Sequence, residues 1–187
     1  MNSWDAHVER SVHAFVLGHR WVFHLASWLT HLGDPLVVTL ATIALSAVLL
    51  ARGARRAAVF VLAVRAVAIV ADTGLKHAVD RTRPVLAHPL ATAAGASFPS
   101  GHAFGSAALW GTFAALLPAP RWARLATAVV VPVVVAATRV LLGVHYVSDV
   151  LAGLLLGWAA AALGAKAFGV PRPGSPSMAP VHEVNDR

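Results

Sequence analysis

The chain has no cysteine among its 187 residues, which excludes disulfide bonds, thiolate metal ligands and a cysteine nucleophile. Charged residues are also scarce, at 12% of the chain, whereas a typical soluble domain has about a quarter. Apolar residues take their place: they make up 58% of the sequence, and the mean hydropathy is +0.69. These values exclude an ordinary soluble domain and predict an all-α, polytopic transmembrane helical bundle.

The few charges are mostly positive, with 15 Lys and Arg against 8 Asp and Glu and a formal net charge of +7. The arginines stand at the ends of apolar runs and form no continuous basic face, so we expect no nucleic acid partner. Anionic membrane lipid is the expected partner instead. A cleaved signal peptide is not expected, because Asp5, Glu9 and Arg10 precede a stretch that histidines and a further arginine interrupt.

Residues 1–34 form an N-terminal segment in which apolar side chains alternate with charges and histidines. An amphipathic helix lying in the membrane interface is the favoured interpretation, and a sixth membrane helix is the alternative. We do not expect activity to depend on this segment. No metal site is expected either, because the histidines share no repeated helical spacing. These histidines are His7, His13, His19, His24 and His31.

About five membrane spans are expected within residues 35–168, the predicted catalytic domain. Each apolar segment is long enough to cross roughly 30 Å of hydrocarbon as a helix. Pro132 lies within one of them and is tolerated in a membrane helix as a kink. The Pro-, Gly- and Ser-rich residues 169–187 are predicted to be a disordered tail. The expected spans are about 35–51, 57–76, the segment from Pro99-Ser100-Gly101-His102 to Leu117, 125–144 and 147–168.

Two charged residues fall inside the second expected span. A charge at the bilayer centre costs about 2.5 to 3.5 kcal/mol on insertion scales, so both must face protein or water. Arg65 is interpreted as paired inside the bundle. Asp72 lies one helical turn before Lys76, where its carboxylate can orient the lysine ammonium.

Alternating helix directions divide the remaining polar residues between two membrane faces. The positive-inside rule makes one face cytoplasmic and puts the other on the extracytoplasmic side of the cell membrane. A cysteine introduced at position 88 is therefore expected to react with an external reagent, and one at position 121 is not. The basic residues of the cytoplasmic face are Arg52, Arg55, Arg56, Arg121, Arg124, Lys166 and Arg172.

Basic residues on the extracytoplasmic face predict a phosphate site. Lys76, Arg83 and Arg139 supply three positive charges at span ends or in the long polar loop of residues 77–98. A helix beginning at Ser100-Gly101 adds backbone N–H groups and the positive end of its dipole. An arginine guanidinium suits phosphate oxygens in particular, because its donors form a fork.

Two histidines on the same face provide the chemistry. His145 and Asp149 are four residues apart, so a helix beginning near His145 places the carboxylate beside the imidazole and fixes its tautomer. Gly143 offers a break that lets Arg139 reach the same point. We expect His145 to attack phosphorus and His102 to protonate the departing oxygen. The polar residues interpreted as solvated loop residues are His77, Asp80, Arg81 and His88.

Three motifs in this order resemble the signature of the type 2 phosphatidic acid phosphatase (PAP2) superfamily: Lys76-x6-Arg83-Pro84, Pro99-Ser100-Gly101-His102 and Arg139-x5-His145-x3-Asp149. Thr138 replaces the serine that usually precedes the arginine of the third motif and keeps the hydroxyl. The resemblance implies a membrane phosphatase that needs no metal or cofactor. It would hydrolyse phosphomonoester or diphosphate head groups of lipids, phosphatidic acid-like or isoprenoid, through a phosphohistidine intermediate. The implied residues are His145, Asp149 and His102 for catalysis and Lys76, Arg83, Ser100, Gly101 and Arg139 for phosphate binding.

Two alternatives stay open on the same residues. Vanadium haloperoxidases share the motif set and hold vanadate at the corresponding place, although their known members are soluble. A small membrane protein that binds or carries anionic lipid without cleaving it is the second alternative. The motifs select neither a particular lipid phosphate nor an oligomeric state.

Overall fold

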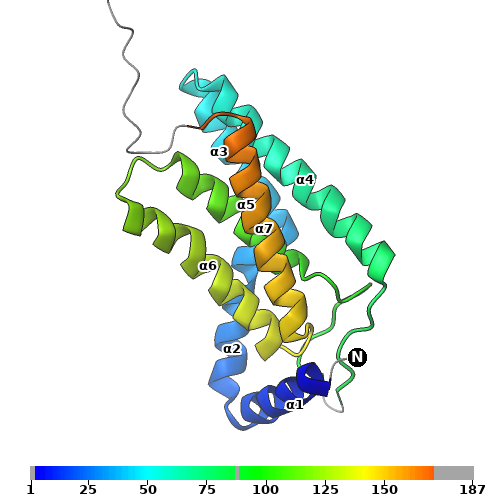
Figure 1. Ribbon diagram of the computed structural model, residues 1–187. Helices are drawn as coiled ribbons and strands as arrows, with labels where there is room; N and C mark the ends of the chain where they lie inside the picture. The colour runs from blue at the N-terminus through cyan, green and yellow to red at the C-terminus, as the bar shows by residue number, and fades with distance from the viewer. Residues whose placement is uncertain (1–2, 87–88, 171–187) are drawn as a thin grey trace, which may run out of the picture.

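The computed structural model describes residues 3–86 and 89–170, so nearly all of the expected tail lies outside the described residues. Within these residues the chain forms α-helices and one short 3-10 helix, with no strand, which confirms the all-α prediction. Figure 1 shows their arrangement. The α-helices are α1 (Ser3–Gly18), α2 (Arg20–Leu29), α3 (Pro35–Ala51), α4 (Arg55–Val79), α5 (Gly101–Leu116), α6 (Arg121–Leu141) and α7 (Val147–Ala167), and the 3-10 helix η1 is Thr30–Gly33.

Each segment expected to span the membrane is a helix. By length and composition, α4, α6 and α7 can each cross a membrane. The pair Arg20–Gly33 and Pro35–Ala51, bent by 42° at its break, provides a fourth crossing if it is one broken span. The multi-pass membrane architecture is therefore confirmed, while α3 and α5, with 17 and 16 residues, are shorter than the other expected spans.

Local sequence accounts for the main helix boundaries. The carboxylate of Asp34 accepts a hydrogen bond of 2.8 Å from the backbone of Leu36, which caps α3 at the position where Pro35 begins it. Helix α6 begins differently: Pro120 is its N-cap residue, without a side-chain cap, and Pro132 lies inside the helix. Helix α4 ends at Val79, and its C-cap residue Asp80 has a left-handed φ of 40°. The long polar loop starts there.

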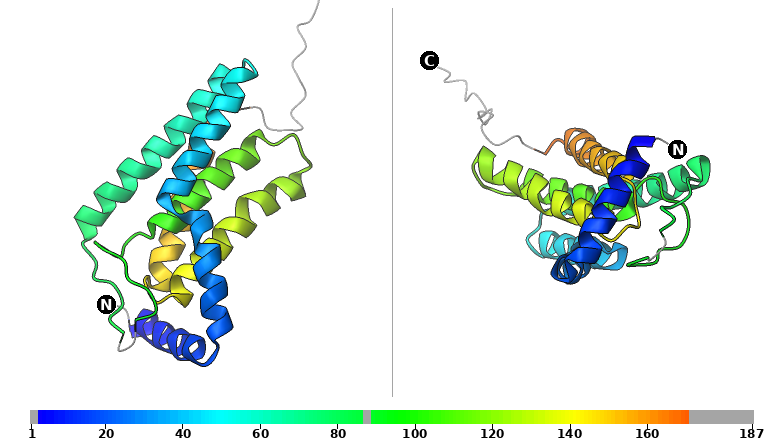
Figure 2. Two further views of the ribbon diagram at one scale, coloured as in Figure 1. Left: turned by 180° about the vertical axis from the view of Figure 1, so that it is seen from behind. Right: turned by 90° about the horizontal axis from the view of Figure 1, so that it is seen from below.

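Helix α5 forms the centre of the bundle and packs against α4, α6 and α7 (Figure 2). Helix α7 approaches α5 closely because Gly153 and Gly157 of α7 face the α5 backbone. A Cβ atom on Gly157 would lie 2.5 Å from the carbonyl oxygen of Phe104. Large apolar side chains of the outer helices, such as Val70 and Leu155, are instead exposed, as expected for surfaces that face lipid.

Helix α1 lies across one end of the bundle, beside the turn between α6 and α7 (Figures 1 and 2). The start of α5 and the loop that follows α4 point toward the same end. The α3–α4 and α5–α6 connections lie at the opposite end. The predicted phosphate site therefore lies at the opposite end of the molecule from the described basic residues of the predicted cytoplasmic face. Arg172 of that set lies outside the described residues.

Candidate active site

The turn between α6 and α7 carries His145 at the α1 end of the bundle. Helix α6 ends at Leu141, and Gly143 then adopts a φ of +70°, which a residue with a side chain reaches only at a cost. The backbone N–H of Val144 donates back to the carbonyl of Arg139, at 3.2 Å. This confirms the predicted break at Gly143 and places His145 just before α7 begins.

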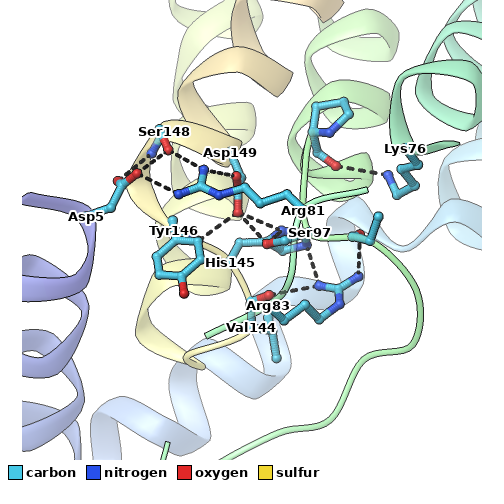
Figure 3. A network of polar contacts seen from close by, with 12 residues as sticks. Asp5, Lys76, Arg81, Arg83, Ser97, Val144, His145, Tyr146, Ser148 and Asp149 are labelled. Atoms are coloured by element: carbon cyan, nitrogen blue, oxygen red, sulfur yellow. Dashed lines mark hydrogen bonds and ion pairs between the residues drawn. The ribbon is translucent and has the colours of Figure 1, made fainter. Parts of the chain in front are cut away.

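Asp149 lies in the first turn of α7 and is completely buried. Its Oδ2 atom accepts a 2.9 Å hydrogen bond from the backbone N–H of Tyr146 and a 2.5 Å bond from the hydroxyl of Ser97. The same oxygen lies 3.6 Å from Nδ1 of His145 (Figure 3). The predicted pairing of His145 with Asp149 is thus present, with the carboxylate fixed by its other donors.

Arg83 faces the other nitrogen of the His145 ring. Its Nη1 atom lies 3.1 Å from Nε2 of His145 and also donates to the carbonyl of Val144 at 2.8 Å (Figure 3). Since a guanidinium can only donate, Nε2 is the acceptor and the ring proton is on Nδ1, toward Asp149. The lone pair of Nε2 is therefore directed toward the guanidinium of Arg83.

The imidazole of His145 is held in its neutral form. Burial lowers its pKa, and the positive charges of Arg83 and Arg139 lower it further, which together outweigh the opposite effect of Asp149. A neutral imidazole whose Nε2 carries no proton is a competent nucleophile once a phosphoryl group takes the place of the Arg83 donor at that lone pair. The electrostatics of the site thus favour the role predicted for His145.

Two more basic residues are held by neighbouring elements. Lys76 forms an ion pair with Asp72, as predicted, and donates to the carbonyl of Pro99 at 2.9 Å. Nη1 of Arg139 donates to the hydroxyl of Thr30 at 2.8 Å. Lys76 is thereby fixed beside the turn that begins α5.

Two polar groups near His145 are buried without a partner. In residues 3–86 and 89–170, neither Nε of Arg139 nor the hydroxyl of Ser100 has a hydrogen bond. The backbone N–H of Ser100 donates to the carbonyl of Asp149 at 3.1 Å, which ties the start of α5 to α7. Buried polar groups normally have partners, so unsatisfied donors here point to an anionic ligand.

His102 is the second residue of α5 and is partly buried. The charges of Arg139 and Arg83 and the ring of His145 are close enough to interact with it electrostatically. The structure therefore brings both predicted histidines and the predicted basic residues to one end of the bundle.

Residues 56–173 match the model of the PAP2 superfamily, which is more than half of the chain. The chain belongs to the PAP2 superfamily. Family membership thus agrees with the three motifs and with the geometry that brings them together.

Several PAP2 and lipid phosphatase relatives are similar to this chain. Lipid A 1-phosphatase of Rhizobium etli is 40% identical over 92 residues, which cover 44% of this chain and 38% of that protein. Phosphatidylglycerophosphatase B of Bacillus subtilis is 38% identical over 90 residues, which cover 44% of each chain. The crystal structure of a transmembrane PAP2 type phosphatidylglycerolphosphate phosphatase from Bacillus subtilis has a TM-score of 0.77 at 25% identity, over 92% of this chain and 88% of that one. The curated relatives are matched over less than half of their length.

Two residues that are not among the specified positions of the PAP2 motifs also belong to the site: Arg81, in the x6 stretch of the first motif, and Ser97. Arg81 was interpreted as solvated, which is wrong: its Nη1 atom lies 2.6 Å from Oδ1 of Asp149, and its Nη2 atom lies 2.9 Å from a carboxylate oxygen of Asp5. Ser97 holds the other oxygen of Asp149. The partners of Arg81 are 68 and 76 residues away along the chain, so no local pattern indicates them.

The expected loop of residues 77–98 begins later than predicted, because α4 continues to Val79 and includes His77 in its last turn. His77 and Asp80 are exposed, as expected, whereas His88 lies outside the described residues.

Arg65, inside α4, donates to the hydroxyl of Thr39 and to the carbonyl of Pro35, so it is paired inside the bundle as predicted.

Proposed function

We propose that this PAP2 protein is a phosphatase that removes phosphate from lipid phosphates or isoprenoid diphosphates in the membrane. The observation that carries the proposal is the position of Nε2 of His145, 3.1 Å from the guanidinium of Arg83 and backed by buried Asp149 on the other side of the ring. The names of the relatives, a lipid A 1-phosphatase and a phosphatidylglycerophosphatase B, support a lipid phosphate as substrate.

The proposed reaction has two displacement steps. Nε2 of His145 attacks phosphorus, the bond between phosphorus and the lipid oxygen breaks, and His102 donates a proton to that oxygen. Water then attacks the phosphohistidine, His102 takes a proton from the water, and inorganic phosphate leaves. Asp149 stabilises the positive charge that forms on the imidazole in the first step.

The phosphate cradle follows from the groups that converge beside His145. Lys76, Arg83 and Arg139 provide positive charge, and the unpartnered Nε of Arg139 and hydroxyl of Ser100 provide hydrogen bonds. The N–H of Gly101, at the start of α5, is the proposed backbone donor. Fixed donors of this kind stabilise charge that develops on the phosphoryl oxygens in the transition state.

Purified protein is expected to release phosphate from a lipid phosphate at an unchanged rate in an excess of a metal chelator. The reason is that three basic side chains and a helix start already neutralise the transferring phosphoryl group. Vanadate is expected to inhibit competitively, because it adopts the five-coordinate shape of the transition state. Phosphate release that strictly requires added magnesium contradicts the proposed cradle.

The proposed site faces the extracytoplasmic side of the cell membrane. Because the native chain has no cysteine, single cysteines report this directly. Position 88 lies outside the described residues, so we use a neighbouring position of the same loop instead. Val85 lies at the active-site end and is 95% exposed, which makes Val85→Cys a suitable reporter. An impermeant thiol reagent applied to intact cells is expected to label Val85→Cys and not Arg121→Cys. The reverse pattern overturns the orientation.

A further inference from the structure

The N-terminal helix α1 reaches the proposed active site through one buried carboxylate. Asp5 is only 1% exposed, although it lies in the first turn of the helix. Its Oδ2 atom accepts hydrogen bonds from Arg81 at 2.9 Å and from the hydroxyl of Ser148 at 2.5 Å, and its Oδ1 atom accepts one from the backbone of Ser148 at 3.2 Å (Figure 3). Three donors therefore fix this carboxylate.

Arg81 joins the Asp5 carboxylate to that of Asp149. One nitrogen of its guanidinium contacts Asp149 and Ser148, and another contacts Asp5. The guanidinium also lies over the ring of Tyr146, 4.3 Å from the ring centre. The path from α1 to the nucleophile thus runs through adjacent groups, from Asp5 to Arg81, to Asp149 and to His145.

The charges along this path explain why a second carboxylate matters. Arg81 alone would neutralise Asp149, leaving His145 with no net negative partner. With Asp5 included, the two carboxylates and the guanidinium have a net charge of −1, and Asp149 is the member of this group that faces the imidazole. That charge is what stabilises the positive imidazole of the phosphohistidine step.

We propose that Asp5 is a positioning residue that acts through Arg81, holding the guanidinium in place and compensating its charge so that Asp149 can support His145. The proposal rests on the proposed phosphatase function. It also reverses the expectation that activity does not depend on the N-terminal segment.

Other charged groups around this path do not replace Asp5. His145 faces Asp149 on α7, Arg83 in the loop, Arg139 on α6 and His102 on α5. Of these four, only Asp149 is negative. Glu9, one turn after Asp5 on α1, is buried, but its Oε1 atom has no hydrogen-bond partner in the described part of the chain.

Asp5→Asn is expected to lower kcat by about 10- to 100-fold, the usual cost of removing a group that orients a site residue through an intermediate side chain. KM is expected to change little, because Asp5 does not touch substrate. The acidic limb of the pH profile of kcat is expected to move to lower pH, since losing a negative charge disfavours protonated His145. Asp5→Glu, which keeps the charge, should restore part of the rate.

The control is Asp80→Asn, which removes an exposed carboxylate next to Arg81 in sequence. Asparagine also tolerates the left-handed φ of 40° at that position. This variant is expected to keep the wild-type rate and pH profile. Thermal unfolding of each purified variant checks that the fold survives.

A double-mutant cycle with Arg81→Met decides whether Asp5 acts through Arg81. In the Arg81→Met background, Asp5→Asn is expected to cause little further loss, because its partner is absent. Additive losses, or a pH profile that Asp5→Asn leaves unmoved, overturn the proposal. Phosphate release by wild-type protein that His145→Ala abolishes would still support the phosphatase function, so the two failures are distinguishable.

Discussion

His145→Ala is expected to abolish turnover of every phosphate ester, with a loss of at least about 10⁴-fold, the scale on which removal of a nucleophile acts. The physical reason is the geometry of the imidazole. Its Nε2 atom carries no proton and faces Arg83, and Asp149 lies behind the ring. Among the described residues, His145 is the only histidine that hydrogen-bonds to Arg83. Phosphate release by the purified variant, assayed with a lipid phosphate and with an activated aryl phosphate, measures the effect.

His77→Ala is the matched control, because His77 is exposed and lies in the last turn of α4 at the same end of the bundle. It should retain the wild-type rate. Recovery of activity by His145→Ala with the activated ester alone would instead assign His145 the role of an acid and contradict its role as the nucleophile.

His102→Ala is expected to reduce turnover of an alkyl lipid phosphate by about 10² to 10⁴-fold, the usual contribution of a general acid. The loss should be clearly smaller with an activated aryl phosphate, because its phenolate leaves without a proton. The position of His102 at the start of α5, within electrostatic range of His145, supports this role. The comparison requires both substrates and rates measured at one pH.

His77→Ala again provides the reference, and the ratio of the two losses is the informative quantity. Equal losses of the His102→Ala variant on the two substrates would mean that His102 does not protonate the leaving group. In that case its part in the site would be to bind phosphate.

Much of the site could be predicted because its residues lie at fixed spacings around helix ends. The interval between His145 and Asp149 and the glycine at 143 each correspond to a local geometry that the structure contains. The ion pair of Asp72 and Lys76 is local in the same sense. The helix segments were also predictable, since long apolar runs and prolines set their boundaries.

The contribution of α1 could not be predicted in this way. Asp5 and Arg81 meet only because α1 folds across the end of the bundle, and no periodicity in the N-terminal segment indicates where it docks. The spacing rules that identify the motifs describe neighbours along one helix. Contacts between distant segments depend on packing, which for this chain includes the close approach of α7 to α5 at Gly157.

If phosphate passes through a covalent bond to Nε2 of His145, that bond can be trapped during turnover. Purified protein would be mixed with a lipid phosphate, quenched at alkaline pH, where phosphohistidine survives, and digested for mass spectrometry. A phosphoryl group is expected on the peptide containing His145, and none in the His145→Ala variant. Rapid turnover with no phosphorylated His145, or a phosphoryl group on His102 instead, would contradict a covalent bond to His145.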